Sequence, residues 1–316
     1  MPVSQRFIDL LNMPGPALKR LADERNVHYP AGAGKWTIAR AVARSGTREE
    51  LEDASDGFLY AGRTSMTWFR LIDPDDFDED DPDSFYPLDG DALDLDEVRE
   101  ALEEHSEGDP FDEDDRPQSI DRQPKLVLAR EWRDGILMTF AVAKRAGQVI
   151  HDFELVEVLE DEFFPAFLRL EDGVIEVRSS SGRARALHVG WLEDFTDSLG
   201  LVAVPVSITE QDVRAFRDEI EGRLAKWGGS ESSGTSAIGT VTYGKSDQVD
   251  DLFEEEEFAE RTAGYDPVAY DLLFDHDDEE DIRVHVSTLR GSVFIRNSVP
   301  EAVMRYIYEA MRTAKA

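Results

Sequence analysis

Three residues come closest to a catalytic set, and their types would suit metal-assisted hydrolysis in a nuclease: Asp152, Glu176 and Arg178. Arg does not readily replace the Lys that activates water in such a strand, and a related stretch further along has Phe294 in the position of Glu176. The six His residues show neither HExxH spacing nor pairs four residues apart. The sequence therefore predicts no catalytic residues, no metal ligands and no cofactor, and the enzyme alternative stays open.

Two segments each match part of a known ligand-binding loop, but neither contains all the residues that the loop requires. GAGKWT at 32–37 matches the end of a phosphate-binding P-loop, but Tyr29 stands where the first Gly is needed, and Trp36 where Ser or Thr would bind magnesium. In DGDALDLDE at 89–97, Leu93 takes the place of a calcium ligand of an EF-hand, and the sixth position is not Gly. Neither segment predicts a nucleotide or calcium site.

The composition indicates the environment more clearly than the reaction. The net charge of −35, from 69 Asp and Glu against 34 Lys and Arg, exceeds what ordinary solubility requires. At molar salt the Debye length is about 3 Å, so this self-repulsion becomes harmless. We therefore expect a halophilic archaeal protein of the cytoplasm, since the start of the chain resembles no signal peptide and no apolar run is long enough to span a membrane. The absence of Cys excludes disulfides and thiolate metal sites.

The residues 1–56 form the exception in charge. Apolar residues recur at helical spacing throughout this segment, and its eight basic residues balance its eight acidic ones, whereas acidic residues are in large excess over the whole chain. We predict a small helical domain with one apolar face of Leu18, Leu21, Ala22 and Val27, and another of Ile38, Ala39 and Val42. A capping box of Thr47 and Glu50 would open its last helix. The eight basic residues are Arg6, Lys19, Arg20, Arg25, Lys35, Arg40, Arg44 and Arg48.

The segment 17–42 resembles the helix, extended loop, helix pattern of SAP and HeH-type modules, many of which bind DNA. It departs from that pattern at Asn26, where a Gly is usual, and its loop is longer than is typical. The resemblance implies that the loop and the start of the second helix face DNA, and the alternative is a protein-docking or purely structural domain. Leu18, Leu21, Arg25, Val27, Gly34, Lys35 and Ile38 carry the match, and the predicted DNA-binding residues are Lys19, Arg20, Lys35, Trp36, Arg40 and Arg44.

Residues 57–124 are predicted to be short strands followed by an acidic linker or insertion. The aromatic and β-branched residues of 58–72 favour strands, whereas roughly half of 73–115 is Asp or Glu. Within the acidic run, 91–105 has the pattern of one acidic helix.

A β-rich body starts at residue 125, and its first half covers 125–227. Short turns between alternating segments predict an antiparallel meander, followed by a helix that buries Ala184, Leu187, Trp191 and Phe195. After a strand at 202–208, a second helix with a cap of Thr209 and Asp212 is predicted to bury Val213, Phe216, Ile220, Leu224 and Trp227. The meander strands are 125–132, 136–145, 151–158, 163–170 and 174–179.

The residues 228–236 are predicted to be a flexible linker, and 237–316 a second half with the same final unit as the first. The stretches 167–195 and 282–311 each have the order strand, Gly, strand, Arg, cap, amphipathic helix. Gly173 aligns with Gly291, and Arg178 with Arg296. Arg178 and Arg296 are either partner-binding residues or structural salt bridges at strand ends. The last helix is expected to begin with a capping box of Ser298 and Glu301 and to present Val303, Ile307, Ala310 and Ala314 on its apolar face.

These elements predict an α+β fold with a duplicated antiparallel sheet and helices packed on one face. A helical N-terminal domain, an acidic spacer and a β-rich body whose halves end in strand, Arg and helix are similar in layout to the CENP-N and CENP-L group of kinetochore proteins. That resemblance implies a TBP-like saddle and binding to chromatin or protein.

The function that we predict is that of a non-enzymatic DNA-associated or adaptor protein. The alternative is a structural or assembly protein, part of a virion or multi-subunit complex, which binds protein through the open sheet face. Expected partners are double-stranded DNA, other proteins or further copies of the chain, and not a membrane.

Overall fold

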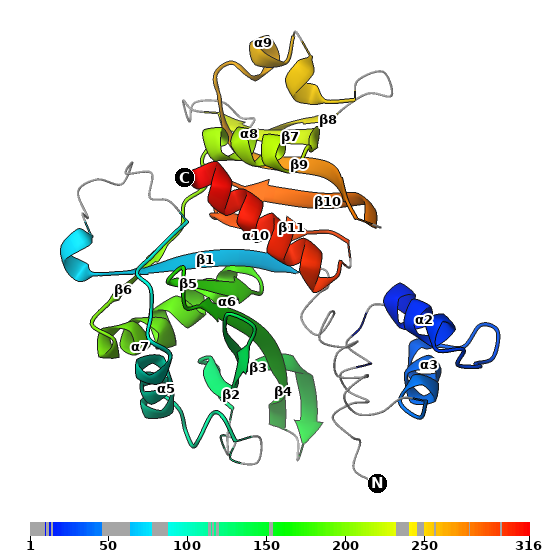
Figure 1. Ribbon diagram of the computed structural model, residues 1–316, viewed down its shortest axis with the longest axis vertical. Helices are drawn as coiled ribbons and strands as arrows, with labels where there is room; N and C mark the ends of the chain where they lie inside the picture. Colours follow the sequence, from blue (N-terminus) through cyan, green and yellow to red (C-terminus); the bar gives the residue numbers. More distant parts are fainter. Residues whose placement is uncertain are drawn as a thin grey trace. The chain divides into compact units, whose positions relative to one another are not determined.

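The computed structural model describes residues 10, 13, 15–45, 64–77, 88–112, 115, 117, 120–151, 154–231, 240–244, 250–255, 257–277, 279–297 and 299–316. The protein has a mixed α+β fold with antiparallel sheet structure (Figure 1). It divides into two compact units. The first unit comprises the described residues of 1–64, 213–286 and 294–314, and the second those of 65–212, 287–293 and 315–316.

The sheet of the second unit has the strand order β2-β3-β4-β5-β1, with β6 paired to the same strand β1. All these pairs are antiparallel, and β1 pairs with both β5 and β6, which lie more than 100 residues further along the chain. The bounds are β1 (Ser65–Ile72), β2 (Lys125–Trp132), β3 (Gly135–His151), β4 (Glu154–Arg169), β5 (Val174–Arg178) and β6 (Val202–Pro205), and the 3-10 turn η1 (Pro74–Asp76) follows β1.

Helices cover one face of this sheet and form its core with it (Figure 1). The segment after β5 runs as α6 (Ser181–Leu187), a π-helical turn η2 (His188–Leu192) and α7 (Glu193–Ser198). The predicted apolar face is confirmed, because Ala184, Leu187, Trp191 and Phe195 are all buried in the core cluster. Trp191 stacks on Phe195 with ring centroids 4.8 Å apart and contacts Phe140 of β3 edge to face.

The acidic segment contributes a helix to the same core. The predicted helix is α5 (Leu95–Glu104), and Asp94 caps it by accepting hydrogen bonds from the backbone N–H groups of Asp96 and Glu97. Val98, Ala101 and Leu102 are buried against the sheet. Part of the segment predicted as strands plus acidic linker therefore belongs to the core of the second unit.

The first unit has the strand order β11-β10-β9-β7-β8, and the division between the units falls within β11. In Figure 1 the helices α8 and α10 lie on one face of these strands. Phe274 of β9 contacts Tyr306 of α10, with ring centroids 6.1 Å apart. The bounds are α8 (Glu210–Glu219), β7 (Arg223–Glu231), β8 (Thr240–Gly244), η3 (Leu252–Glu254), α9 (Phe258–Thr262), β9 (Tyr265–His276), β10 (Glu279–Ser287), β11 (Ser292–Ile295) and α10 (Glu301–Lys315).

The prediction of one helix that continues to Trp227 is wrong for its second half. The capping box at its start is confirmed, since the Thr209 N–H donates to Asp212 and the Asp212 N–H donates to the Thr209 hydroxyl. However, α8 ends at Glu219, because Glu221 adopts a left-handed φ of 49° and the Gly222 N–H donates back to a carbonyl of the last turn. Leu224 and Trp227 are buried on β7 instead.

The strand boundaries also differ from the prediction. The segments 151–158 and 163–170 were predicted as two strands, but 154–158 and 163–169 belong to the single strand β4, and His151 ends β3. The strand β9 was not predicted. The pairing of β5 with β4 begins at Ala166, so Pro165, which lies opposite Thr139 of β3, precedes the part of β4 that is paired on both sides. Gly228–Glu231, predicted as linker, continue β7, and the rest of that segment lies outside the described residues.

Near the N-terminus, α2 (Gly15–Glu24) and α3 (Lys35–Val42) pack on each other through a small core of their own. The predicted helix, loop, helix order is observed. Asn26 adopts a left-handed φ of 53°, and the Val27 N–H donates to the Ala22 carbonyl to end α2. Leu18, Leu21, Ala22, Ile38, Ala39 and Val42 are buried as predicted. The predicted capping boxes of Thr47 and of Ser298 lie outside the described residues, as does Asp152.

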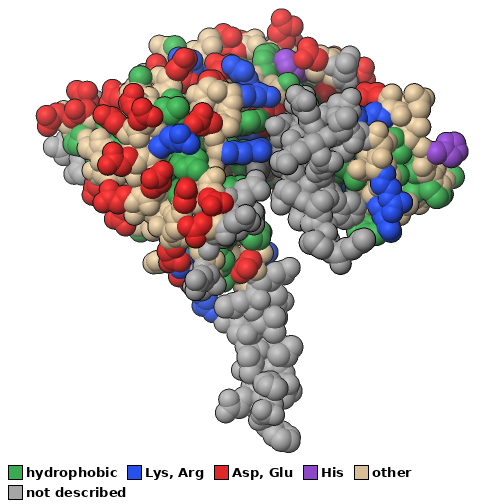
Figure 2. All heavy atoms as spheres, turned by 60° about the horizontal axis from the view of Figure 1, so that its bottom comes forward, with side chains coloured by type: hydrophobic (Ala, Val, Ile, Leu, Met, Phe, Trp, Pro, Cys, Tyr) green, Lys and Arg blue, Asp and Glu red, His purple; other side chains and the backbone are tan. Residues whose placement is uncertain are grey.

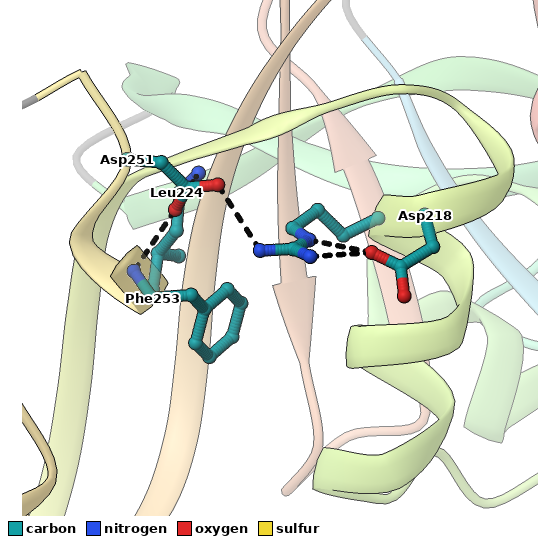
Figure 3. Close-up of polar contacts among 5 residues, drawn as sticks. Asp218, Leu224, Asp251 and Phe253 are labelled. Atoms are coloured by element: carbon teal, nitrogen blue, oxygen red, sulfur yellow. Dashed lines mark hydrogen bonds and ion pairs between the residues drawn. The ribbon is translucent and has the colours of Figure 1, made fainter. Parts of the chain in front are cut away.

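One buried carboxylate attaches η3 to the sheet of the first unit (Figure 3). Asp251 accepts hydrogen bonds from the backbone N–H groups of Leu224 and Phe253, at 3.1 and 2.9 Å. Its other oxygen is 3.1 Å from the guanidinium of Arg217 in α8. The guanidinium of Arg214 lies over the Phe253 ring at 4.2 Å. These contacts join three elements of the first unit.

We predict that Asp251→Asn, which keeps one acceptor oxygen but removes the charge, lowers the free energy of unfolding by about 1–3 kcal/mol. Asp251→Ala should lower it further, because the buried N–H of Leu224 then has no acceptor. Urea unfolding at constant salt measures both. Asp250→Asn is the control, since Asp250 is exposed. Equal stability of the Asp250 and Asp251 variants would contradict the assigned role.

Candidate functional site

The exposed face of α3 gathers aromatic and basic side chains predicted to bind DNA. Trp36 has 53% of its surface exposed, and the Arg40 guanidinium lies 5.3 Å above the centre of its ring. Both residues follow Gly34, which precedes the helix, and the buried Ile38 and Ala39 hold the opposite face. The arrangement presents a flat aromatic surface beside a delocalised cation, a combination that stacks on nucleobases and contacts phosphates.

Lys35 lies at the first turn of the same helix. Partial burial lowers the pKa of its ammonium group. The positive end of the helix dipole at this position also disfavours a cation and favours an anion. A phosphate bound here would therefore relieve both effects, because it would pair with Lys35 and with the N–H groups of the first turn.

The other predicted DNA-binding residues differ in their surroundings. Lys19 and Arg44 are exposed, and Arg44 follows the end of α3. Arg20 instead makes an ion pair of 2.7 Å with Glu279 of β10, within the same unit. The structure thus places Lys35, Trp36, Arg40 and Arg44 on one helix and its C-terminal end, whereas Arg20 is already engaged.

Arg178 lies in a buried charged network of the second unit. The Arg178 Nε–H donates to Glu176 at 2.6 Å, and the second oxygen of Glu176 accepts from Trp68 Nε1 at 3.1 Å and from Arg169 at 3.4 Å. The side chains of Glu176 and Arg178 have no exposed surface. Of the two alternatives for Arg178, these contacts support the structural salt bridge, because a side chain without exposed surface offers no face to a partner.

Burial alone would raise the pKa of Glu176. The charges of Arg178 and Arg169, together with the hydrogen bonds from Trp68 and Arg178, outweigh burial and hold that pKa below its usual value of 4.5. Glu176 is therefore ionised at neutral pH. Its role is to neutralise buried guanidinium groups, and it is not held in the protonated form that a general acid needs.

Arg296, which aligns with Arg178 in sequence, is in a more open setting. Its guanidinium lies 3.3 Å from Asp271, which also accepts a hydrogen bond of 2.5 Å from His285 Nδ1. The side chain of Arg296 is 38% exposed and that of His285 31%, whereas that of Asp271 is 7% exposed. Sequence reasoning predicted Arg296 but missed Asp271 and His285. The strand register that brings them together depends on β9, which was not predicted.

Acidic side chains are widespread on the described surface. Figure 2 shows Asp and Glu side chains spread over the described part of one face, with Lys and Arg in smaller groups. Within the described residues, no group of three or more His, Asp or Glu side chains is placed to hold a metal ion. Nor is any helix of the described segments both long and apolar enough to cross a membrane.

Comparison with known proteins adds no family assignment, because the sequence matches no protein-family model and no curated protein.

We predict that Glu176→Gln lowers the free energy of unfolding by about 3–5 kcal/mol at neutral pH, because it leaves the buried Arg169 and Arg178 without their shared counter-charge. Chemical unfolding followed by tryptophan fluorescence measures the change. Glu131→Gln is the matched control, since the Glu131 side chain is 53% exposed in its ion pair with Arg99; it should change stability by less than about 0.5 kcal/mol.

The same carboxylate predicts a pH dependence with a definite sign. Because the pKa of Glu176 is lowered on folding, its contribution is fully present above its unfolded value of 4.5 and is lost as pH falls through the lower folded value. Stability measured between neutral pH and pH 3 should therefore fall less steeply on the acid side for Glu176→Gln than for the unmodified protein. If the free energy of unfolding fell equally with decreasing pH in the two proteins, this role of Glu176 would be excluded.

Proposed function

We propose that the protein is a non-enzymatic, DNA-associated or adaptor protein, and that α3 with the preceding loop binds duplex DNA. The observation that carries the proposal is the exposed Trp36 beneath the Arg40 guanidinium, on a segment in which basic residues outnumber acidic ones. Residues 10–45 contain six Lys and Arg against two acidic residues, whereas the whole chain has a net charge of −35. A basic surface on so acidic a chain favours a polyanionic partner.

The local backbone supports the resemblance to SAP and HeH-type modules. The pattern has Gly where this sequence has Asn26, and Asn26 adopts the left-handed conformation that Gly takes most readily. Asn26 in place of Gly therefore preserves the turn that ends α2. The loop that follows α2 then leads to Gly34 and Lys35, the step at which the resemblance expects the contact with DNA.

Molar salt in the cell would also explain why an aromatic side chain and a guanidinium, and not Lys residues alone, form the proposed contact with DNA. Salt screens charges and weakens the counterion release that drives most binding to DNA. An exposed indole and a stacked guanidinium gain affinity from contact area and hydrogen-bond geometry as well as from charge. The Trp36 and Arg40 pair suits DNA binding in a halophilic cytoplasm better than isolated Lys residues would.

We further propose that the body is a TBP-like duplication. Gly173 and Gly291 both have positive φ angles, 57° and 55°, and each is followed by a short strand and then a helix. An added Cβ at either Gly would come within about 2.2 Å of a backbone carbonyl oxygen, so the two turns have the same requirement for Gly. This equivalence supports two related halves.

We predict that the double variant Lys35→Glu with Arg40→Glu binds duplex DNA at least about tenfold more weakly than the unmodified chain, because it loses two cationic contacts. Trp36→Ala should lose about fivefold or more, because the contact area of the exposed indole is lost. Fluorescence anisotropy of a labelled duplex, titrated with the intact protein in molar potassium chloride, measures the affinities.

The matched control is the double variant Arg185→Glu with Arg290→Glu, which makes the same charge change at two exposed positions of the second unit. It should bind DNA like the unmodified chain. Equal affinity of both double variants would refute the interface on α3. If the unmodified chain does not bind DNA and instead forms a defined oligomer in light scattering, the alternative function in protein assembly is favoured.

A further inference from the structure

Figure 1 shows α8 and α10 on one face of β7, β9 and β10. A second group of basic side chains lies around Asp271 on the opposite face, because Phe274 of β9 contacts α10 and side chains alternate along a strand. The strand register pairs Lys226 with Asp271, and Asp271 with His285, so the three side chains form one row across three adjacent strands. The neighbouring positions Tyr270 and Leu272 are buried with the core. Arg296, just after β11, reaches the same Asp271.

This row borders a cavity of about 200 Å³ in the first unit. The cavity is hollow because small residues lie where larger side chains would fill it: Gly228 faces Ala269 across the β7–β9 pair. An added Cβ at Gly228 would lie 3.8 Å from that of Ala269 and would occupy part of the space. Thr242 of β8 and Trp227 complete the lining on the side away from His285.

The cavity has more hydrogen-bond donors than its one carboxylate can satisfy. Asp271 takes its two contacts from His285 Nδ1 and Arg296. Among the described residues, Lys226 has no hydrogen bond or ion pair, and the remaining nitrogens of Arg296 and the Nε2 of His285 have none either. One carboxylate thus faces a guanidinium, an ammonium and an imidazole. Cationic hydrogen-bond donors that line a cavity are what an anion requires.

Burial raises the pKa of Asp271, but the hydrogen bond from His285 and the charges of Arg296, His285 and Lys226 outweigh burial and lower it. Asp271 therefore stays ionised and holds the His285 and Arg296 side chains in place. It does so through one oxygen, because both contacts are made to Oδ1.

We propose that this cavity binds a phosphate group, either free phosphate or the terminal phosphate of a small phosphomonoester. The Arg296 guanidinium matches phosphate with paired hydrogen bonds, the Lys226 ammonium adds a second cationic donor, and His285 Nε2 adds a third donor when the imidazole is protonated. The volume is below the range of about 300–1,000 Å³ that is usual for whole drug-sized ligands, so the charged end fills the cavity and any remainder lies outside. This site is separate from the surface of α3 and does not depend on DNA binding.

Isothermal titration calorimetry of the full chain in potassium chloride tests the proposal, with inorganic phosphate, glycerol phosphate and acetate as probes. Saturable binding of phosphate and weaker or no binding of acetate are expected. Arg296→Gln should weaken phosphate binding about tenfold or more, because a charged hydrogen-bond donor is lost. Binding of glycerol phosphate as well would identify a phosphomonoester ligand, and its exclusion would identify free phosphate.

Two further variants keep the test decisive. Lys226→Gln should also weaken binding, and it should fold normally, because Lys226 is exposed and has no ion pair among the described residues. Arg290→Gln is the matched control, because Arg290 is exposed and lies five residues before Ile295, the last residue of β11. It should bind phosphate like the unmodified chain. No saturable phosphate binding by the folded protein, equal binding of acetate, or unchanged binding by both Arg296→Gln and Lys226→Gln would overturn the proposal.

Discussion

The second unit depends on one carboxylate that joins strands far apart in the sequence. Glu176 lies on β5, and it accepts hydrogen bonds from Trp68 of β1, 108 positions earlier, and from Arg169 of β4. Because β1, β4 and β5 are neighbours in the sheet, the same carboxylate both neutralises buried guanidinium groups and aligns the strands. A buried charge without such partners would be strongly unfavourable, so the side chains of Glu176, Trp68, Arg169 and Arg178 depend on one another.

The first unit uses similar chemistry in a different setting. Asp271 also bonds two basic side chains from neighbouring parts of the sheet, but His285 and Arg296 are about one-third exposed. In the network of Glu176 the carboxylate is enclosed, which supports a structural role. Around Asp271, Lys226 and Arg296 keep unused donors and line a cavity. The difference in exposure, and not the residue types, separates a structural network from a binding site.

Much of the fold could be predicted from the sequence where local signals agreed. The core face of α6 and α7, the helix α5 and the capping box of Thr209 and Asp212 follow from spacing and cap residues alone. The helical period continued past the end of α8, because Leu224 and Trp227 keep the spacing of Phe216 and Ile220. The real end of the helix requires Glu221 in a left-handed conformation, which its residue type does not favour.

The strand β9 could not be predicted, because Leu272, Leu273 and Phe274 are all buried and remove the alternation that indicates a strand. Without β9 there was no basis for placing Asp271 beside His285 and Arg296, and His285 had no motif around it. The surface of α3 was predictable, because all its residues lie within ten positions of one another on one helix and its end. In a chain with a net charge of −35, basic side chains that outnumber acidic ones are themselves a signal. That signal is visible in the sequence when it is local, as at α3, and only in the structure when a sheet assembles it from separate strands.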